Sequence, residues 1–139
     1  MLVLQGGAAL SSSRLSRLLS ELRDAGHADA VVSARWLHLV QFGEPLSVRE
    51  REVLDRVLTY GEAADELQAF DHELVVAPRP GTISPWSSKA TDIVHSCGLA
   101  KVERLERVAR VRLAGVDAGA LAWLRARLHD RMTEVVLPG

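Results

Sequence analysis

The sequence predicts an α+β fold in which helices cover one face of an antiparallel sheet. Strand-like and helix-like patterns alternate in the order strand, helix, long strand, helix, and this order occurs twice along the chain. The halves, about 1–70 and 71–139, share little residue identity, so the repeat is one of architecture. Two such units sharing one sheet predict a ferredoxin-like pseudo-dimer, and 139 residues suit a single domain.

The first half contains four predicted elements. A short apolar run at 1–4 suits a strand, and three serines followed by spaced leucines predict a helix over 11–26 that ends at a glycine. Apolar and mixed positions alternate over 30–42, which predicts a long strand. A serine and a glutamate at capping-box spacing then open a helix over 47–61.

The second half repeats this order. The apolar run 74–77 predicts a strand that ends at prolines, and a helix follows that is closed by Gly98. Alternation over 102–114 predicts the second long strand. A last helix is expected from Asp117 through Met132, with leucines at helical spacing.

Composition excludes several classes of function. A hydrophobic content of 47% and a charged content of 25% are typical of a globular protein. The formal net charge of -1 argues against nucleic-acid and membrane partners. No run is long enough to cross a membrane and the start lacks a signal-peptide layout, so a cytoplasmic location is expected.

One strand of the second half carries a basic face that could suggest RNA binding. Glutamates interrupt it and stacking aromatic residues are missing, which favours a solvated or ion-pairing face. The basic residues are Arg104, Arg107, Arg110 and Arg112.

Catalytic and metal sites are not expected within this chain. Cys97 is the only cysteine, and His95 lies two residues away, a spacing that points to different sides of a helix. We therefore interpret Cys97 as a buried apolar residue rather than a nucleophile. The five histidines form no close ligand cluster, and His38 is interpreted as a sheet histidine with a hydrogen-bond partner.

The run Pro78–Ile93 is the most unusual part of the chain. Prolines, a glycine, a tryptophan and many hydroxyls stand between an apolar strand and an apolar helix. Hydroxyls with Lys89 before a helix suggest a phosphate site, but the spacing is not that of a P-loop. The alternative is that Ser84 caps the helix, Pro85 takes its first position, and the loop forms a docking surface.

Two side chains of this run are candidates for contacts with another domain. Trp86 has the large apolar area and single N–H donor of an interface anchor, or it folds back over Ile93 and the sheet. Arg79 stands between two prolines, and this stiff backbone suits a fixed salt bridge to another domain.

These residues also carry a resemblance to a known family. Pro78–Ile93, followed by His95, Cys97–Leu99 and Arg104–Glu106, resembles the N-terminal domain of phosphoribosylformylglycinamidine synthase in its long single-chain form. This family is also called formylglycinamide ribonucleotide amidotransferase. Supporting matches are Gly7–Ser11 and Leu128–Glu134, so the resemblance covers almost the whole chain.

The resemblance implies a part in purine biosynthesis. Enzymes of the family convert formylglycinamide ribonucleotide to formylglycinamidine ribonucleotide with ATP and with ammonia from glutamine. A synthetase region binds ATP and magnesium, a glutaminase region carries a Cys-His-Glu triad, and the N-terminal domain resembles a dimer of a small separate subunit. This chain would then be part of a longer polypeptide, a noncatalytic adaptor without cofactor whose partners are the synthetase and glutaminase domains.

The resemblance and the loop chemistry together give the candidate contact residues. Those of the docking loop are Arg79, Gly81, Thr82, Ser84, Pro85, Trp86, Ser87, Ser88, Lys89 and Asp92. A second contact is expected on the last helix, at His129, Asp130 and Arg131. The alternative function is a free-standing ferredoxin-like regulatory module that binds a small ligand at Gly81–Lys89.

Overall fold

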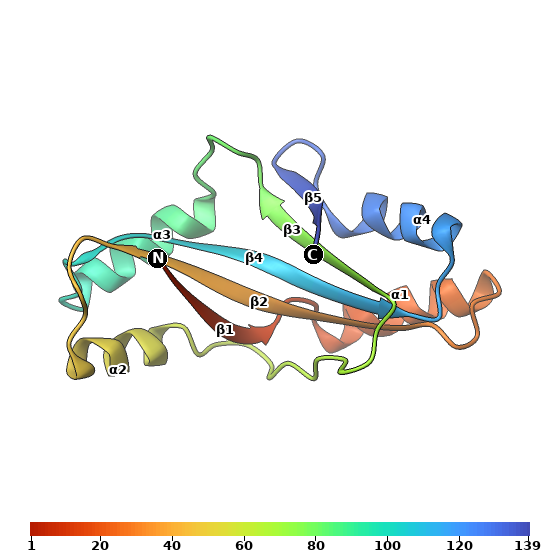
Figure 1. Cartoon of the computed structure of the whole chain (residues 1–139), viewed down its shortest axis with the longest axis horizontal. Coiled ribbons are helices and arrows are strands. Elements are labelled where there is room, and N and C mark those ends of the chain that lie inside the picture. The colour runs from red at the N-terminus through yellow and green to blue at the C-terminus, as the bar shows by residue number, and fades with distance from the viewer.

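The computed structural model describes residues 1–139, and it confirms the predicted α+β, ferredoxin-like fold (Figure 1). The elements, in chain order, are β1 (Leu2–Ala8), α1 (Ser12–Asp24), β2 (Val31–Phe42), α2 (Val48–Val57), β3 (His72–Pro78), α3 (Pro85–Ser96), β4 (Val102–Ala114), α4 (Ala118–Leu128) and β5 (Glu134–Pro138). The sheet has the strand order β1-β2-β4-β3-β5, and every neighbouring pair is antiparallel.

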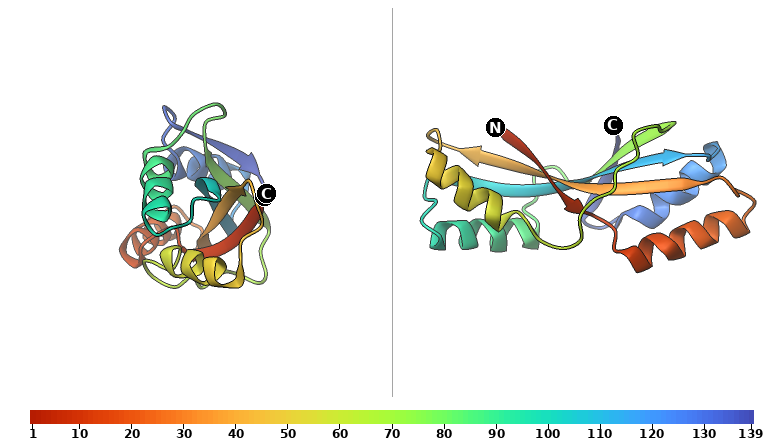
Figure 2. Two further views of the ribbon diagram at one scale, coloured as in Figure 1. Left: turned by 90° about the vertical axis from the view of Figure 1, so that its left-hand side faces the viewer. Right: turned by 90° about the horizontal axis from the view of Figure 1, so that it is seen from below.

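All four helices lie on one face of the sheet, as the right-hand view of Figure 2 shows. Helices α1 and α4 cover one end of the long central strands, and α2 and α3 cover the other end. Each pair therefore combines one helix from each half of the chain. This arrangement follows from the order of the elements, because β2 and β4 run antiparallel through the middle of the sheet.

The hydrophobic core is divided into two clusters that correspond to the two helix pairs. One cluster contains Leu22 of α1 and Leu124 of α4, and the other contains Leu54 of α2 and Val94 of α3. Between the clusters lies a group of aromatic and polar side chains, which we call the central zone. Its members are Trp36, His38, Tyr60, Trp86 and Arg107.

The C-terminal part of the chain differs from the expectation of a helix as far as Met132. Helix α4 ends at Leu128, and a turn leads into β5, which pairs with the outer edge of β3. The β-branched Val135 and Val136 suit a strand, and this pairing covers a β3 edge whose backbone groups would otherwise be free. His129, Asp130 and Arg131 therefore lie after the last helix and not on it.

The connection between the halves leaves the helix-covered side and reaches the other face of the sheet (Figure 2, right). There the Glu66 carboxylate lies between three arginines, with Oε1 3.6 Å from Arg35, 2.7 Å from Arg110 and 3.3 Å from Arg112. These arginines lower the pKa of Glu66, chiefly through the hydrogen bond from Arg110. The expected basic face is thus an ion-pairing face at Arg110 and Arg112.

Arg107 does not belong to that basic face, so its expected position is wrong. It alternates along β4 with Leu105 and Ala109, which contribute to the two hydrophobic clusters, and its side chain therefore lies on the helix-covered side.

No helix of the structure combines the length and hydropathy that crossing a membrane requires.

Candidate functional site

The start of α3 forms as the sequence predicts. Ser84 is the N-cap, and its Oγ accepts a hydrogen bond from the Ser87 amide at 3.0 Å. Pro85 occupies the first turn, where its missing N–H costs nothing. The loop that precedes it is closed by Thr82, whose amide and hydroxyl both donate to the Arg79 carbonyl.

Two hydroxyls of α3 take the place of a neighbouring strand. Strand β3 pairs with β4 only from Ala109 to Leu113, so the backbone of Leu105 has no strand partner on that side. Instead the Ser87 hydroxyl donates to the Leu105 carbonyl, and the Thr91 hydroxyl accepts from the Leu105 amide at 3.1 Å. Buried backbone groups need such partners, which explains part of the hydroxyl content of this run.

Ser87 is consequently not available for docking. Its side chain is fully buried, and its hydroxyl is bonded to β4. The prediction that Ser87 is a docking contact is therefore wrong. Thr91 was not among the candidates, although it lies four residues after Ser87 and therefore on the same helix face. Ser88, Lys89 and Asp92 are exposed on the outer side of α3.

The loop is also fixed to β4 through Glu106. The Glu106 carboxylate accepts from the Ser84 hydroxyl at 2.8 Å and lies 3.3 Å from the Arg104 guanidinium. Arg104 donates in turn to the Thr82 carbonyl at 3.2 Å. These charge-assisted contacts hold the loop in one conformation.

The two sets of candidate residues lie side by side. The Arg79 guanidinium donates to the carbonyl of Arg131, with Nε 3.1 Å from the oxygen, and the Arg79 amide donates to Thr133 at 2.9 Å. Asp130 supports the same turn by accepting from the Met132 amide at 2.9 Å. Arg79, which was expected to bind another domain, thus joins the loop to the 129–133 turn within this chain.

Trp86 folds back toward the sheet, as in one of its two expected positions, but it packs on His38 and not on Ile93, which is exposed. Its ring is stacked on His38 with 5.6 Å between centroids, and it is half-buried. The Arg107 guanidinium lies 4.8 Å from the Trp86 ring and 3.9 Å from the Trp36 ring. Both distances are within the range of cation–π attraction.

His38 is a buried histidine, and its Nε2 lies 2.8 Å from the Tyr60 hydroxyl. Burial, and to a smaller extent the positive charge of Arg107, lower the pKa of His38 to about 4. The imidazole is therefore neutral at physiological pH. Gly6 makes room for it, because a Cβ at that position would stand 2.4 Å from the ring.

Acidification is expected to destabilise the fold through His38. The unfolded state, in which His38 has its ordinary pKa of 6.5, binds the proton more readily than the folded state. The contribution of His38 to stability is therefore complete above pH 6.5 and is lost as the pH falls toward 4. We expect a loss of about 2 kcal/mol, reduced by solvent screening at the neighbouring cavity. Urea unfolding at pH 7 and pH 4.5 measures it, with His38→Phe as the control that lacks this component. An equal loss in both proteins would contradict the assignment.

A cavity of about 360 Å³ opens beside the central zone, and we call it the loop cavity. Its walls come from the loop, the 132–134 turn and the sheet. The lining residues are Trp36, Val76, Pro78, Thr82, Ile83, Ser84, Pro85, Trp86, Glu106, Arg107, Met132, Thr133 and Glu134. Ile83 and Met132 at its rim are 63% and 84% exposed, although their apolar side chains gain nothing from contact with water.

A comparison with known protein families shows the family to which this chain belongs. The family described as formylglycinamide ribonucleotide amidotransferase N-terminal matches residues 35–139. The chain belongs to this family. The resemblance carried by Pro78–Ile93 is therefore confirmed, and the matched range includes the whole loop cavity.

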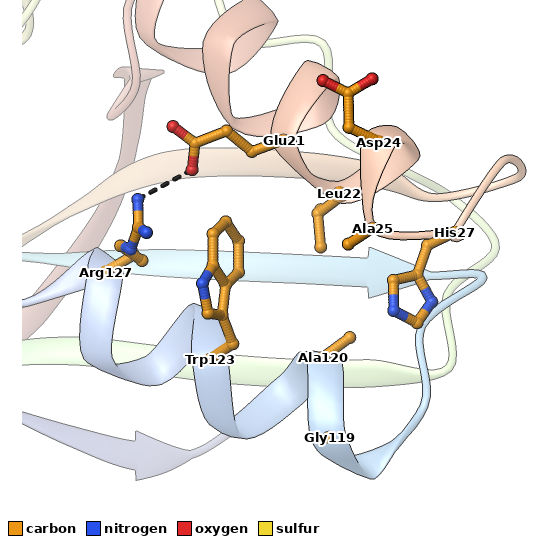
Figure 3. A pocket seen from close by; sticks show the side chains of 9 residues that line it. All are labelled: Glu21, Leu22, Asp24, Ala25, His27, Gly119, Ala120, Trp123 and Arg127. Atoms are coloured by element: carbon orange, nitrogen blue, oxygen red, sulfur yellow. Dashed lines mark hydrogen bonds and ion pairs between the residues drawn. The ribbon is translucent and has the colours of Figure 1, made fainter.

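A second cavity of this amidotransferase N-terminal domain lies between α1 and α4 and measures about 600 Å³ (Figure 3). Trp123 forms a wall, and Arg127 lies 4.4 Å from its ring while pairing with Glu21 at 2.8 Å. The sequence did not predict this cavity. The leucines and alanines of the two segments indicated only that each forms a helix with a buried face. The space between α1 and α4 depends on how the two helices pack against each other, which the sequence pattern does not show.

Cys97 differs from its interpretation as a buried core residue. It follows the last turn of α3 and is exposed. The buried positions of this helix are Ser87, Ala90 and Val94, because the bond from Ser87 to β4 rotates that face toward the sheet. His95 directs its Nε2 to the Val102 carbonyl at 2.6 Å.

Proposed function

We propose that this chain is the noncatalytic adaptor domain of phosphoribosylformylglycinamidine synthase. The parent enzyme would be the ATP- and glutamine-dependent ligase that forms formylglycinamidine ribonucleotide in purine biosynthesis. In this proposal the domain bridges the synthetase and glutaminase regions of the same polypeptide and supports ammonia transfer between them. The observation that carries the proposal is the family match over residues 35–139.

The surface around the loop cavity supports the docking role. The loop and the 129–133 turn are held to each other by Arg79 and to β4 by Ser84 and Glu106, so the surface is organised before any partner binds. Exposed apolar side chains at the rim, Ile83 and Met132, suit burial against another domain. ATP and magnesium would bind to the synthetase region, and this chain would contribute no ligand to them.

Substitution at the rim tests the proposal in the complete amidotransferase polypeptide. Ile83→Glu and Met132→Glu would place a charge where the partner domain docks, and burying an unpaired charge is costly. We expect at least a tenfold lower rate of glutamine-dependent synthesis, with ammonia-dependent synthesis less affected and the melting temperature of the domain unchanged.

Val48→Glu is the matched control, because Val48 is 79% exposed and lies on α2, outside the loop cavity. Equal glutamine-dependent rates for the rim variants and this control would contradict the docking role. The alternative, a regulatory module for a small ligand, is tested by calorimetry of this chain with nucleotides and amino acids. Tight binding of either would overturn the adaptor function.

A further inference from the structure

Arg107 is a half-buried cation without a carboxylate partner. The ion pairs of the structure engage the other arginines of β4 and leave Arg107 out. Its side chain hydrogen bonds through Nη1 to the Tyr60 hydroxyl at 3.0 Å, while a guanidinium has five N–H donors. A partly desolvated charge that lacks a counter-ion is costly, which indicates that its partner comes from elsewhere.

Aromatic rings pack against this guanidinium, and of its nitrogen atoms only Nη1 has a hydrogen-bond partner. Trp36 and Trp86 lie against the group at 3.9 and 4.8 Å from their centroids, and Arg107 lines the loop cavity. Such packing fixes a planar guanidinium while its N–H groups stay available for a carboxylate in the same plane.

Of the two carboxylates that line the cavity, Glu106 has a cationic partner and Glu134 has a backbone partner. Glu106 is bonded to Ser84 and Arg104, and Glu134 accepts from the Asp130 amide at 2.9 Å. His38 is neutral and adds no charge beneath Arg107. Arg107 is therefore the one cation of the lining, and it forms an ion pair with neither carboxylate.

We propose that Arg107 receives an aspartate or glutamate side chain from the catalytic domains of the same amidotransferase. This inference rests on the proposed function and identifies the chemistry of its docking site. The cavity, at about 360 Å³, is near the lower end of small-molecule sites and is rimmed by the exposed apolar Ile83 and Met132. A segment of protein supplies both the carboxylate for the floor and the apolar contact for the rim.

A cross-linking experiment on the complete polypeptide tests the contact directly. Arg107→Lys keeps the charge and introduces an amine that a zero-length carbodiimide couples to a carboxylate within contact distance. We expect mass spectrometry to find a cross-link from position 107 to an acidic residue beyond residue 139. Arg56→Lys on the exposed side of α2 is the control and should give no such product. A link from position 107 only to Glu106 or Glu134 would overturn the proposal.

The rate of synthesis separates this inference from the proposed function. Arg107→Gln is expected to lower glutamine-dependent synthesis at least tenfold, and Arg107→Glu should regain activity when the cross-linked acid is changed to arginine. A harmful Ile83→Glu with a silent Arg107→Gln would overturn the carboxylate contact alone. Silence of both variants would overturn the proposed function as well.

Small anions are the competing occupants of the cavity. Acetate and inorganic phosphate can be titrated into the Trp123→Phe variant of this chain. Its two remaining tryptophans, Trp36 and Trp86, both line the loop cavity, so a change in fluorescence reports binding there. We expect no saturation below about 10 mM, because binding to a protein carboxylate depends on the surrounding interface. Saturation at micromolar concentration would identify a small-anion site and overturn the docking of a side chain.

Discussion

Glu66→Ala is expected to lower the free energy of unfolding by about 3 kcal/mol, because three half-buried arginines would lose their shared counter-ion. The Glu66 side chain is 6% exposed, and its two oxygens accept from Arg110 at 2.7 Å each. Its removal would also loosen the connection between the halves at Glu66. The next anchor along the chain would then be the Leu67 amide, which donates to the Ser33 hydroxyl.

Urea unfolding at neutral pH measures this effect. Glu52→Ala is the control, because Glu52 is exposed on α2 and forms no ion pair. We expect Glu66→Gln to fall between the two, since an amide keeps part of the hydrogen bonding and loses the charge. A loss below about 1 kcal/mol for Glu66→Ala would show that water replaces the carboxylate.

Leu54→Ala and Leu124→Ala are each expected to cost about 3 kcal/mol, the usual loss for a buried leucine. The two residues are fully buried but belong to different hydrophobic clusters. Because the central zone separates these clusters, each cavity should loosen only its own helix pair.

Amide hydrogen exchange distinguishes local from global loosening. Leu54→Ala should speed exchange in α2 and α3 and leave α1 and α4 close to the wild type, and Leu124→Ala should do the reverse. Each variant is the control for the other. Equal acceleration in all four helices would show that the two clusters unfold as one unit.

Much of the fold followed from local signals in the sequence. Alternating apolar residues predicted β2 and β4, and the capping residues Ser47 and Ser84 marked two helix starts at the residues that the structure uses. These features depend on neighbours in the chain, so periodicity and capping chemistry suffice to find them.

The parts that the sequence did not predict depend on tertiary partners. Strand β5 forms because β3 offers an open edge, and the leucine spacing of α4 gave no sign of where the helix ends. Ser87 was expected in the docking loop and Thr91 was not among the candidates, yet both hydroxyls bond to β4 because no strand lies beside Leu105. Arg107 shows the reverse case, because strict alternation with Leu105 and Ala109 would have placed it correctly.

The likeness between the two halves ends where the loop begins. Strand β1 reaches α1 through residues 9–11, whereas β3 reaches α3 through residues 79–84, and only the second half has an extra strand. A symmetric pair of subunits would present two equal docking sites in opposite orientations. This chain presents one loop cavity, so in the proposed adaptor role it would dock one catalytic body in a single orientation.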